Sequence, residues 1–151
     1  MAFQDFLNNL KQKASDLKNE VMKFKNKDFL NAAVGSSVLI SMADGHVSSD
    51  EKQKMMRFIE NYEALSVFSS KEIIESFQNT MTQIEFDKDL GEAKAYEAIR
   101  KMKGNDEAAR LIVRLAIAIA GADGNFDDNE KRVARKLAME LGLNPADFEL
   151  A

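Results

Sequence analysis

Two short segments of the chain, 79 residues apart, place acidic side chains around a glycine in nearly the same order. Residues 43–52 read ADGHVSSDEK and residues 122–131 read ADGNFDDNEK. Each segment sets an Asp and a Glu seven residues apart on the two sides of a turn. Oxygen donors of this kind are the ligands that Ca²⁺ and Mg²⁺ take in proteins. The repeat therefore points to a divalent cation as the chemistry to test first.

Both turns contain the second half of an EF-hand calcium loop. With Gly45 and Gly124 at the sixth position of that loop, Glu51 and Glu130 fall at the twelfth, where the loop requires Glu. The oxygen donors required at the first and third positions are missing. Those positions hold Ile40 and Met42 in the first turn and Ile119 and Gly121 in the second. The sequence thus excludes a standard EF-hand and leaves a half-loop with too few oxygens for calcium.

Two half-loops brought together would supply the missing ligands. A pseudo-twofold relation between the two parts of the chain would set the turns side by side, where their carboxylates repel one another unless a cation lies between them. The carboxylates that would meet are Asp123, Asp127, Asp128 and Glu130 of one turn and Asp44, Asp50 and Glu51 of the other. The ion expected is Ca²⁺, with Mg²⁺ or Mn²⁺ as alternatives. Because Asp127 stands where the first turn has Ser48, the second turn is expected to dominate.

The same residues have a purely structural interpretation. Ser48 with Glu51, and Asp127 with Glu130, have the spacing of a capping box, in which two side chains satisfy the first backbone amides of a helix. Asp and Gly after a helix are also ordinary stop residues. His46 beside the first turn is interpreted as an exposed loop residue, because Asn125 stands at the matching place. Both interpretations of the turns, as metal site and as helix caps, remain open at this stage.

Helical periodicity extends over almost the whole chain, and no segment alternates like a β-strand. The sequence predicts an all-α fold, a single compact domain of about seven to eight helices built from two similar halves. An N-terminal amphipathic helix at 1–28 precedes a helical domain at 29–151, whose halves cover about 29–84 and 92–151. The helices expected lie at 3–24, 29–43, 49–62, 70–83, 93–103, 107–122 and 131–141, with a short turn from 145. The segments 29–43 and 107–122 are apolar enough to be central.

The N-terminal segment carries an apolar stripe with basic residues beside it. Residues 1–28 hold six Lys against four acidic residues, a net charge of +2 in a chain whose total is −4. A helix packed on the domain explains the stripe. The alternative is docking on an anionic membrane surface or a partner helix. In that case Lys11, Lys18 and Lys25, which lie off the stripe, would make the contact.

Composition excludes several function classes. The 151 residues include no Cys, so disulfide frameworks, thiolate metal sites and thiol redox chemistry are excluded. With no basic run, nucleic acid is not an expected partner. The first residues do not resemble a signal peptide and no apolar stretch is long enough to cross a membrane, so we expect a cytoplasmic protein. A metal-dependent hydrolase is a minor possibility, since no candidate nucleophile or general base stands near the carboxylates.

Taken together, three stretches of this sequence resemble the TerB tellurite-resistance family. They are 43–55, 124–131 and 142–148, and the likeness also includes 25–29. The resemblance implies an all-helical fold of two similar halves in a bacterial stress system for tellurite, phage and colicin resistance. It also implies a divalent metal at Asp44, Glu51, Asp123, Asp127 and Glu130. The implied partners are a TerC-type integral membrane protein and other tellurite-resistance proteins, reached at the inner membrane face.

Two classes of function therefore lead. The first is a non-catalytic module that binds a divalent cation and docks on a membrane protein. The second is a structural adaptor, without metal, whose acidic turns only cap helices. Direct reduction of tellurite by this chain has no obvious agent, because the chain lacks Cys and a dinucleotide-binding glycine pattern.

Overall fold

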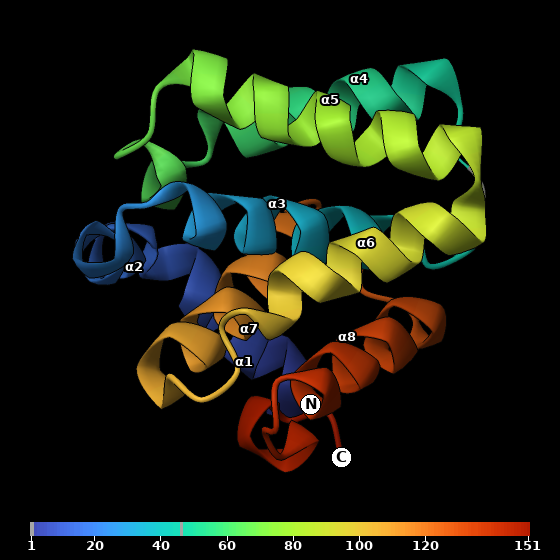
Figure 1. Cartoon of the computed structure of the whole chain (residues 1–151). Coiled ribbons are helices and arrows are strands. Elements are labelled where there is room, and N and C mark those ends of the chain that lie inside the picture. The colour runs from blue at the N-terminus through green and yellow to red at the C-terminus, as the bar shows by residue number, and fades with distance from the viewer. Residues whose placement is uncertain (1, 46) are drawn as a thin grey trace.

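The computed structural model describes residues 2–45 and 47–151 and confirms the all-α prediction (Figure 1). In the described part of the chain there are eight α-helices and three short 3₁₀-helices and no strand. The α-helices are α1 (Ala2–Gln12), α2 (Ala14–Val21), α3 (Lys27–Ser41), α4 (Ser49–Asn61), α5 (Ser70–Phe86), α6 (Lys88–Arg100), α7 (Asp106–Ala120) and α8 (Asp128–Glu140). The 3₁₀-helices are η1 (Met22–Phe24), η2 (Glu63–Leu65) and η3 (Pro145–Phe148).

Helices α3 and α7 form the centre of the fold and lie against each other. Both are buried along most of their length, because their sequences are apolar or small on nearly every face. Figure 1 shows α4 and α5 above α3, and α1, α7 and α8 below it. The prediction that 29–43 and 107–122 are the central helices is correct. The cap of α7 is Asn105 rather than Asp106, since its side chain accepts the hydrogen bond of Ala108 N.

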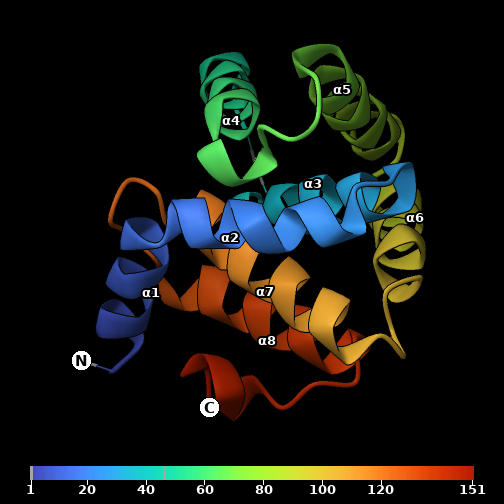
Figure 2. The ribbon, with the colours of Figure 1, turned by 90° about the vertical axis from the view of Figure 1, so that its left-hand side faces the viewer.

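The apolar stripe predicted one continuous helix at 3–24, but the N-terminal segment is broken into two helices. It breaks at Lys13, and the chain turns sharply between α1 and α2 (Figure 2). The apolar stripe itself is buried in the domain, with Leu7 and Val21 fully covered. Helix α1 packs on α7, whereas α2 packs mainly on η2 and less on α7, so the break lets the two parts of the segment contact different parts of the core. The interpretation as a helical segment packed on the domain therefore holds for the apolar face.

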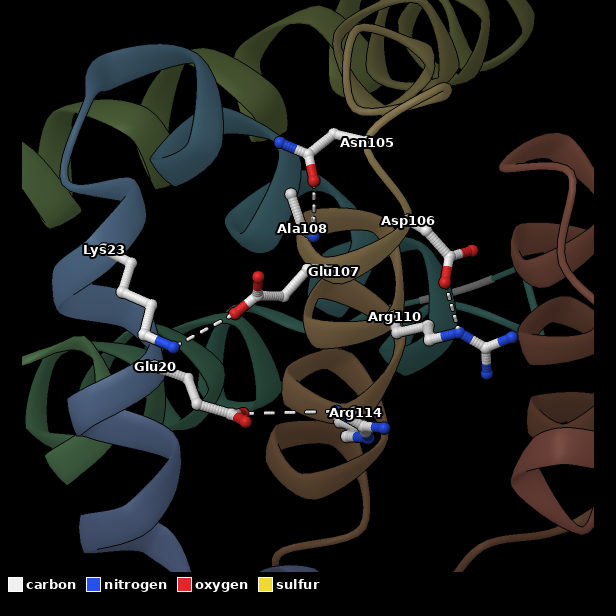
Figure 3. A network of polar contacts seen from close by, with 8 residues as sticks. All are labelled: Glu20, Lys23, Asn105, Asp106, Glu107, Ala108, Arg110 and Arg114. Atoms are coloured by element: carbon white, nitrogen blue, oxygen red, sulfur yellow. Dashed lines mark hydrogen bonds and ion pairs between the residues drawn. The ribbon is translucent and has the colours of Figure 1, made fainter.

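Ion pairs fix this segment to α7 on its outer side. Lys23 Nζ lies 3.2 Å from Glu107 Oε1, and Arg114 lies 4.0 Å from Glu20 (Figure 3). On the other side of α7, Arg110 pairs with Asp106 at 2.9 Å. These side chains are partly or largely exposed, so solvent screens the pairs and each stabilises the fold little.

The helix predicted at 93–103 begins five residues earlier. Asp87 caps α6 by accepting a hydrogen bond from Leu90 N, and Gly91 lies inside the first turn of the helix instead of interrupting it. A Cβ atom at Gly91 would lie 2.4 Å from Ile84 Cα. Glycine is therefore needed here because the backbones of α5 and α6 touch, and not because the chain must stop.

The remaining boundaries follow the sequence signals closely. Ser48, Ser69 and Asp127 each complete a capping box at the start of α4, α5 and α8. The short turn predicted from 145 is present as η3, with Asn144 as its cap and Pro145 at its first position. One large apolar side chain of α4, Phe58, is 47% exposed. Among the described helices, none combines the length and the apolar character needed to cross a bilayer.

Candidate cation site

The glycines of the two acidic turns have the same backbone conformation and make the same hydrogen bond. Gly45 has a φ of +84° and Gly124 a φ of +87°, in the left-handed region where an L side chain is strained. Gly45 N donates to Met42 O at 2.8 Å, and Gly124 N donates to Gly121 O at 2.9 Å. The glycine common to both segments is thus required by the turn.

Both turns lead into a helix through a capping box. In the first, Glu51 N donates to Ser48 Oγ at 3.2 Å while Ser48 N donates to Glu51 Oε1 at 3.1 Å. In the second, Glu130 N donates to Asp127 Oδ1 at 2.8 Å while Asp127 N donates to Glu130 Oε1 at 3.0 Å. The capping interpretation of these four residues is therefore correct. Capping and cation binding are compatible, since a carboxylate has two oxygens and the capping bond to the backbone uses one of them.

The fold brings the two turns to one surface cavity of about 350 Å³. Glu51, at the start of α4, lines it from the first turn, and Asp123 and Glu130 line it from the second. Apolar side chains of α4 and α7, including Met55 and Ile119, complete its wall. Carboxylates separated by 79 residues of sequence therefore share one concave site.

Electrostatics within this cavity centre on Glu130. Burial is the largest cause that raises the pKa of its carboxyl to about 7, and the negative charges of Asp127, Asp123 and Asp44 raise it further. The hydrogen bond from Asp127 N acts in the opposite direction and lowers the pKa. Because Asp44 belongs to the first turn, the charge of one turn reaches the carboxylate of the other. An added positive charge here would relieve repulsion that the folded protein carries.

Lysines lie near the first turn. Lys88, at the start of α6, holds its Nζ atom 3.1 Å from where a Cβ of Gly45 would stand. Lys54 of α4 lines the cavity beside Glu51. Nothing comparable was predicted for Lys88, because only the tertiary fold brings it to this turn. Lys54 could have been predicted to lie beside Glu51, because residues 51, 54 and 55 share one face of α4.

The other predicted site residues lie at the margins. Asp50 is exposed in the first turn of α4. Asp128 is exposed and lines a different cavity, beside Phe3 and Lys131. His46 lies outside the described residues.

The predicted contact lysines stay at the surface. Lys11 and Lys25 are exposed and Lys18 is half-buried. The positive charge of Lys25 is the smallest of the causes that shift the pKa of Glu72, which is lowered mainly by hydrogen bonds from the backbone and side chain of Ser69. Lys25 therefore lies near the start of α5.

Within the described residues, no three acidic or histidine side chains converge closely enough to form a metal cluster as they stand. Each of the capping carboxylates uses one oxygen for the backbone of its own helix. Ca²⁺ takes six to eight oxygens and accepts water and backbone carbonyls among them. The oxygen-only donor set of this cavity fits such an ion if side chains rotate and water completes the shell.

The sequence has counterparts among known proteins. The family model described as "Tellurite resistance protein TerB" matches residues 30–151. This chain belongs to the TerB family. It is 37% identical to the "Tellurium resistance protein TerB" of Alcaligenes sp over 102 residues, which cover 68% of this chain and 84% of that protein. Comparison with solved structures finds no match. The TerB match includes both acidic turns, so membership supports a role associated with tellurite resistance.

Proposed function

We propose that this TerB-family protein is a non-catalytic module that binds a divalent cation, Ca²⁺ first, between its paired acidic turns. The single observation that carries the proposal is the shared cavity, to which Glu51 contributes from one turn and Asp123 and Glu130 from the other. Local capping alone does not require the two turns to meet. A structural adaptor without metal is the second candidate, and the three capping boxes support it.

The roles of the ligands follow from their positions. Glu130 is half-buried and carries the raised pKa, so its carboxylate gains most from a neighbouring cation. Asp123 and Asp127 supply charge from the same turn, and Glu51 and Asp44 supply it from the opposite turn. Asp123 Oδ1 accepts a hydrogen bond from Asn125 N at 2.9 Å, which orients that carboxylate within the turn. The cation would then fix the spacing between α4 and α8.

Docking on a membrane-protein partner of the TerC type is the further part of the proposal. The apolar face of the N-terminal segment is used by the core, so its lysines and the acidic cavity are the surfaces offered to such a partner. The place of action would be cytoplasmic, at the inner face of the membrane, together with other tellurite-resistance proteins. Binding to a reconstituted TerC-type partner should depend on added Ca²⁺ and weaken when Lys11, Lys18 and Lys25 are changed to Glu. Equal binding with and without Ca²⁺ would mean that docking on the partner does not depend on the cation.

Thermal unfolding with and without Ca²⁺, Mg²⁺ or Mn²⁺ tests the cation site. A ligand at 100 times its dissociation constant adds about 2.7 kcal/mol, which for this length raises the unfolding midpoint by roughly 5–10 °C. The change Glu130→Gln should remove the rise, because Gln keeps the capping hydrogen bond and loses the charge.

Asp50→Asn serves as the control for that experiment, since Asp50 also lies in the first turn of a helix but is not among the residues lining the cavity. It should leave the rise intact. An unchanged midpoint with all three ions would leave the structural adaptor. A full response by Glu130→Gln would place the ion elsewhere.

A further inference from the structure

Helix α1 packs against the second acidic turn. Phe3 of α1 and Phe126 of the turn have ring centroids 4.9 Å apart and an interplanar angle of 43°. A Cβ atom at Gly121, where α7 ends and the turn begins, would lie 2.7 Å from Leu7 Cδ1. Gly121 O also accepts the hydrogen bond from Gly124 N within the turn. Side chains one helical turn apart on α1 therefore contact the acidic turn at its start and at its middle.

The apolar residue of the first acidic turn is placed differently. Val47 takes the position of Phe126 in the repeat, and it lines the cavity between the two acidic turns. Phe126 instead lines a separate cavity, together with residues of α1 and η3. The aromatic contact with α1 therefore belongs to the second turn, which is also the turn expected to bind the cation more strongly.

Lys131 adds a charge to the contact between α1 and the second turn. It follows Glu130 directly in the sequence, and its Nζ atom lies 5.1 Å from the centre of the Phe3 ring. The face of an aromatic ring attracts an ammonium group, so Phe3 holds this charge in the cavity beside α1. Lys131 does not line the cavity between the acidic turns. The Phe3 ring thus supports the turn and also keeps a positive charge out of the cation site.

A second phenylalanine of α1 contacts a different part of the fold. The ring of Phe6 lies 6.3 Å from that of Phe148 in η3, between centroids, and 6.4 Å from that of Phe3. Phe148 is fully buried, so this contact joins α1 to the core at the C-terminal end of the chain. Figure 2 shows α1 beside the orange loop that joins α7 to α8. The two rings of α1 therefore have separate partners, the acidic turn for Phe3 and η3 for Phe6.

Helix α1 lies outside the domain that defines the family. The family model matches residues 30–151, which include both acidic turns, α7, α8 and η3. The surface under α1 thus belongs to the family domain, and the helix that covers it comes from a segment before that domain. Because α1 is terminal and is joined to α2 through the break at Lys13, it can leave this surface without unfolding the central helices.

We infer that α1 regulates the cation site, because docking of α1 and binding of a cation by the second turn strengthen each other. The inference rests on the proposed function, since it requires a cation at that turn. A bound cation fixes Asp123 and Asp127, which lie on the two sides of Phe126 in the sequence, and so fixes the ring on which Phe3 packs. A docked α1 orders the turn before the ion arrives, which lowers the entropic cost of binding. Such coupling is reciprocal, so α1 raises the cation affinity by the same factor by which the cation stabilises docked α1.

Calorimetric titration of the full chain with Ca²⁺ tests one direction of this coupling. The change Phe3→Ala should weaken Ca²⁺ binding about three- to tenfold, the range set by the contribution of one aromatic pair. Phe6→Ala is the matched control, because it removes a ring of the same size from the same helix but leaves the contact between Phe3 and Phe126 in place. It should leave the Ca²⁺ affinity unchanged.

Hydrogen exchange of the unaltered chain tests the other direction and does not depend on the folding of a variant of α1. The backbone amides of Leu7 and Leu10 should exchange more slowly in Ca²⁺ than in a chelator, by a factor comparable to the change in affinity. Those of Ile73 and Phe77 in α5 should exchange at the same rate in both, since α5 does not contact the second turn through α1. In Glu130→Gln, Ca²⁺ should no longer slow the exchange in α1.

The outcomes separate this inference from the proposed function. If the parent binds none of Ca²⁺, Mg²⁺ and Mn²⁺ and its exchange does not change, both are overturned. If the parent and Phe3→Ala bind Ca²⁺ equally and Ca²⁺ does not slow exchange in α1, regulation by α1 is overturned and the cation site is kept. Equal weakening by Phe3→Ala and Phe6→Ala would mean a general loosening of the fold, and would likewise overturn regulation through the contact with Phe126.

Discussion

The two acidic turns have the same local features and differ in their surroundings. Both have a glycine with positive φ and a capping box at the following helix. Helix α8 buries Ala134, Leu137 and Ala138, whereas α4 buries Ile59 alone. The position of Leu137 in the repeat corresponds to Phe58, which is 47% exposed. Local sequence therefore sets the turn, and packing decides how firmly each turn is held.

The two turns also differ in charge. The first turn is capped by Ser48 and has the ammonium of Lys88 beside Gly45. The second is capped by Asp127 and contains the half-buried Glu130. The second turn is thus the more negative of the two, and the helix that follows it is the more deeply buried. A cation that enters between them would bind mainly to the second turn and draw the first toward it.

The largest expected effect tests the packing difference. Leu137→Ala should reduce the free energy of unfolding by about 3 kcal/mol, because it removes a fully buried side chain and leaves a cavity. The corresponding Phe58→Ala should cost less than about 1 kcal/mol, since much of that ring is already in water. Denaturant unfolding of both variants measures the difference. Equal losses would contradict the statement that α8 is held more firmly than α4.

Exchange of the two caps tests the charge difference. Asp127→Ser should lower Ca²⁺ affinity about tenfold, measured by calorimetry, because a ligand charge is lost. Its free energy of unfolding without metal should change little, since Ser and Asp cap helices about equally well. Ser48→Asp should raise the affinity instead. Unchanged affinity in both variants would remove the caps from the cation site.

The pH dependence of stability tests the environment of Glu130. Its pKa is raised to about 7 in the folded protein, so the folded state holds the proton more tightly than the unfolded chain. The resulting stabilisation is complete below the ordinary pKa and is lost as pH rises through about 7. Without metal, the parent should therefore lose stability relative to Glu130→Gln as the pH rises from mildly acidic to mildly basic. The expected change in the difference between their free energies of unfolding is about 1 kcal/mol, a value reduced for solvent screening of the half-exposed carboxylate.

Chemical denaturation across that pH range, with a chelator present, gives the measurement. Glu51→Gln is the control, because Glu51 is exposed and has the same capping role at α4. A parallel pH profile for the parent and Glu130→Gln would show that Glu130 does not carry this pH dependence.

The smallest effect concerns Lys88. Lys88→Met should raise Ca²⁺ affinity only a few-fold, since an exposed lysine contributes well under about 1 kcal/mol of repulsion toward the ion. Lys94→Met, a lysine of the same helix outside the acidic cavity, is the control. Calorimetry at low ionic strength resolves the difference, because salt screens it. A weaker binding by Lys88→Met would mean that the lysine supports the site instead of competing with the ion.

Much of the fold could be read from local signals. The pairs Ser48 with Glu51 and Asp127 with Glu130 predicted two helix starts correctly, because a capping box involves residues only three positions apart. The start of α6 was predicted five residues too late, and the backbone contact with Ile84 that requires glycine at position 91 is made by a neighbouring helix. The break at Lys13 was missed for the same reason, because α1 and α2 pack on different neighbours that lie far away in the sequence.

The candidate site also has features that local sequence predicts and features that only tertiary packing decides. The sequence by itself determined the duplicated turn, its glycine and its acidic residues, because turn geometry and capping depend on short-range sterics and hydrogen bonds. Only the tertiary structure decided that Glu51 and Glu130 line one cavity and that Lys88 lies at the first turn. Burial and the distances between charges are set by which helices pack together, and the pKa of Glu130 depends on both.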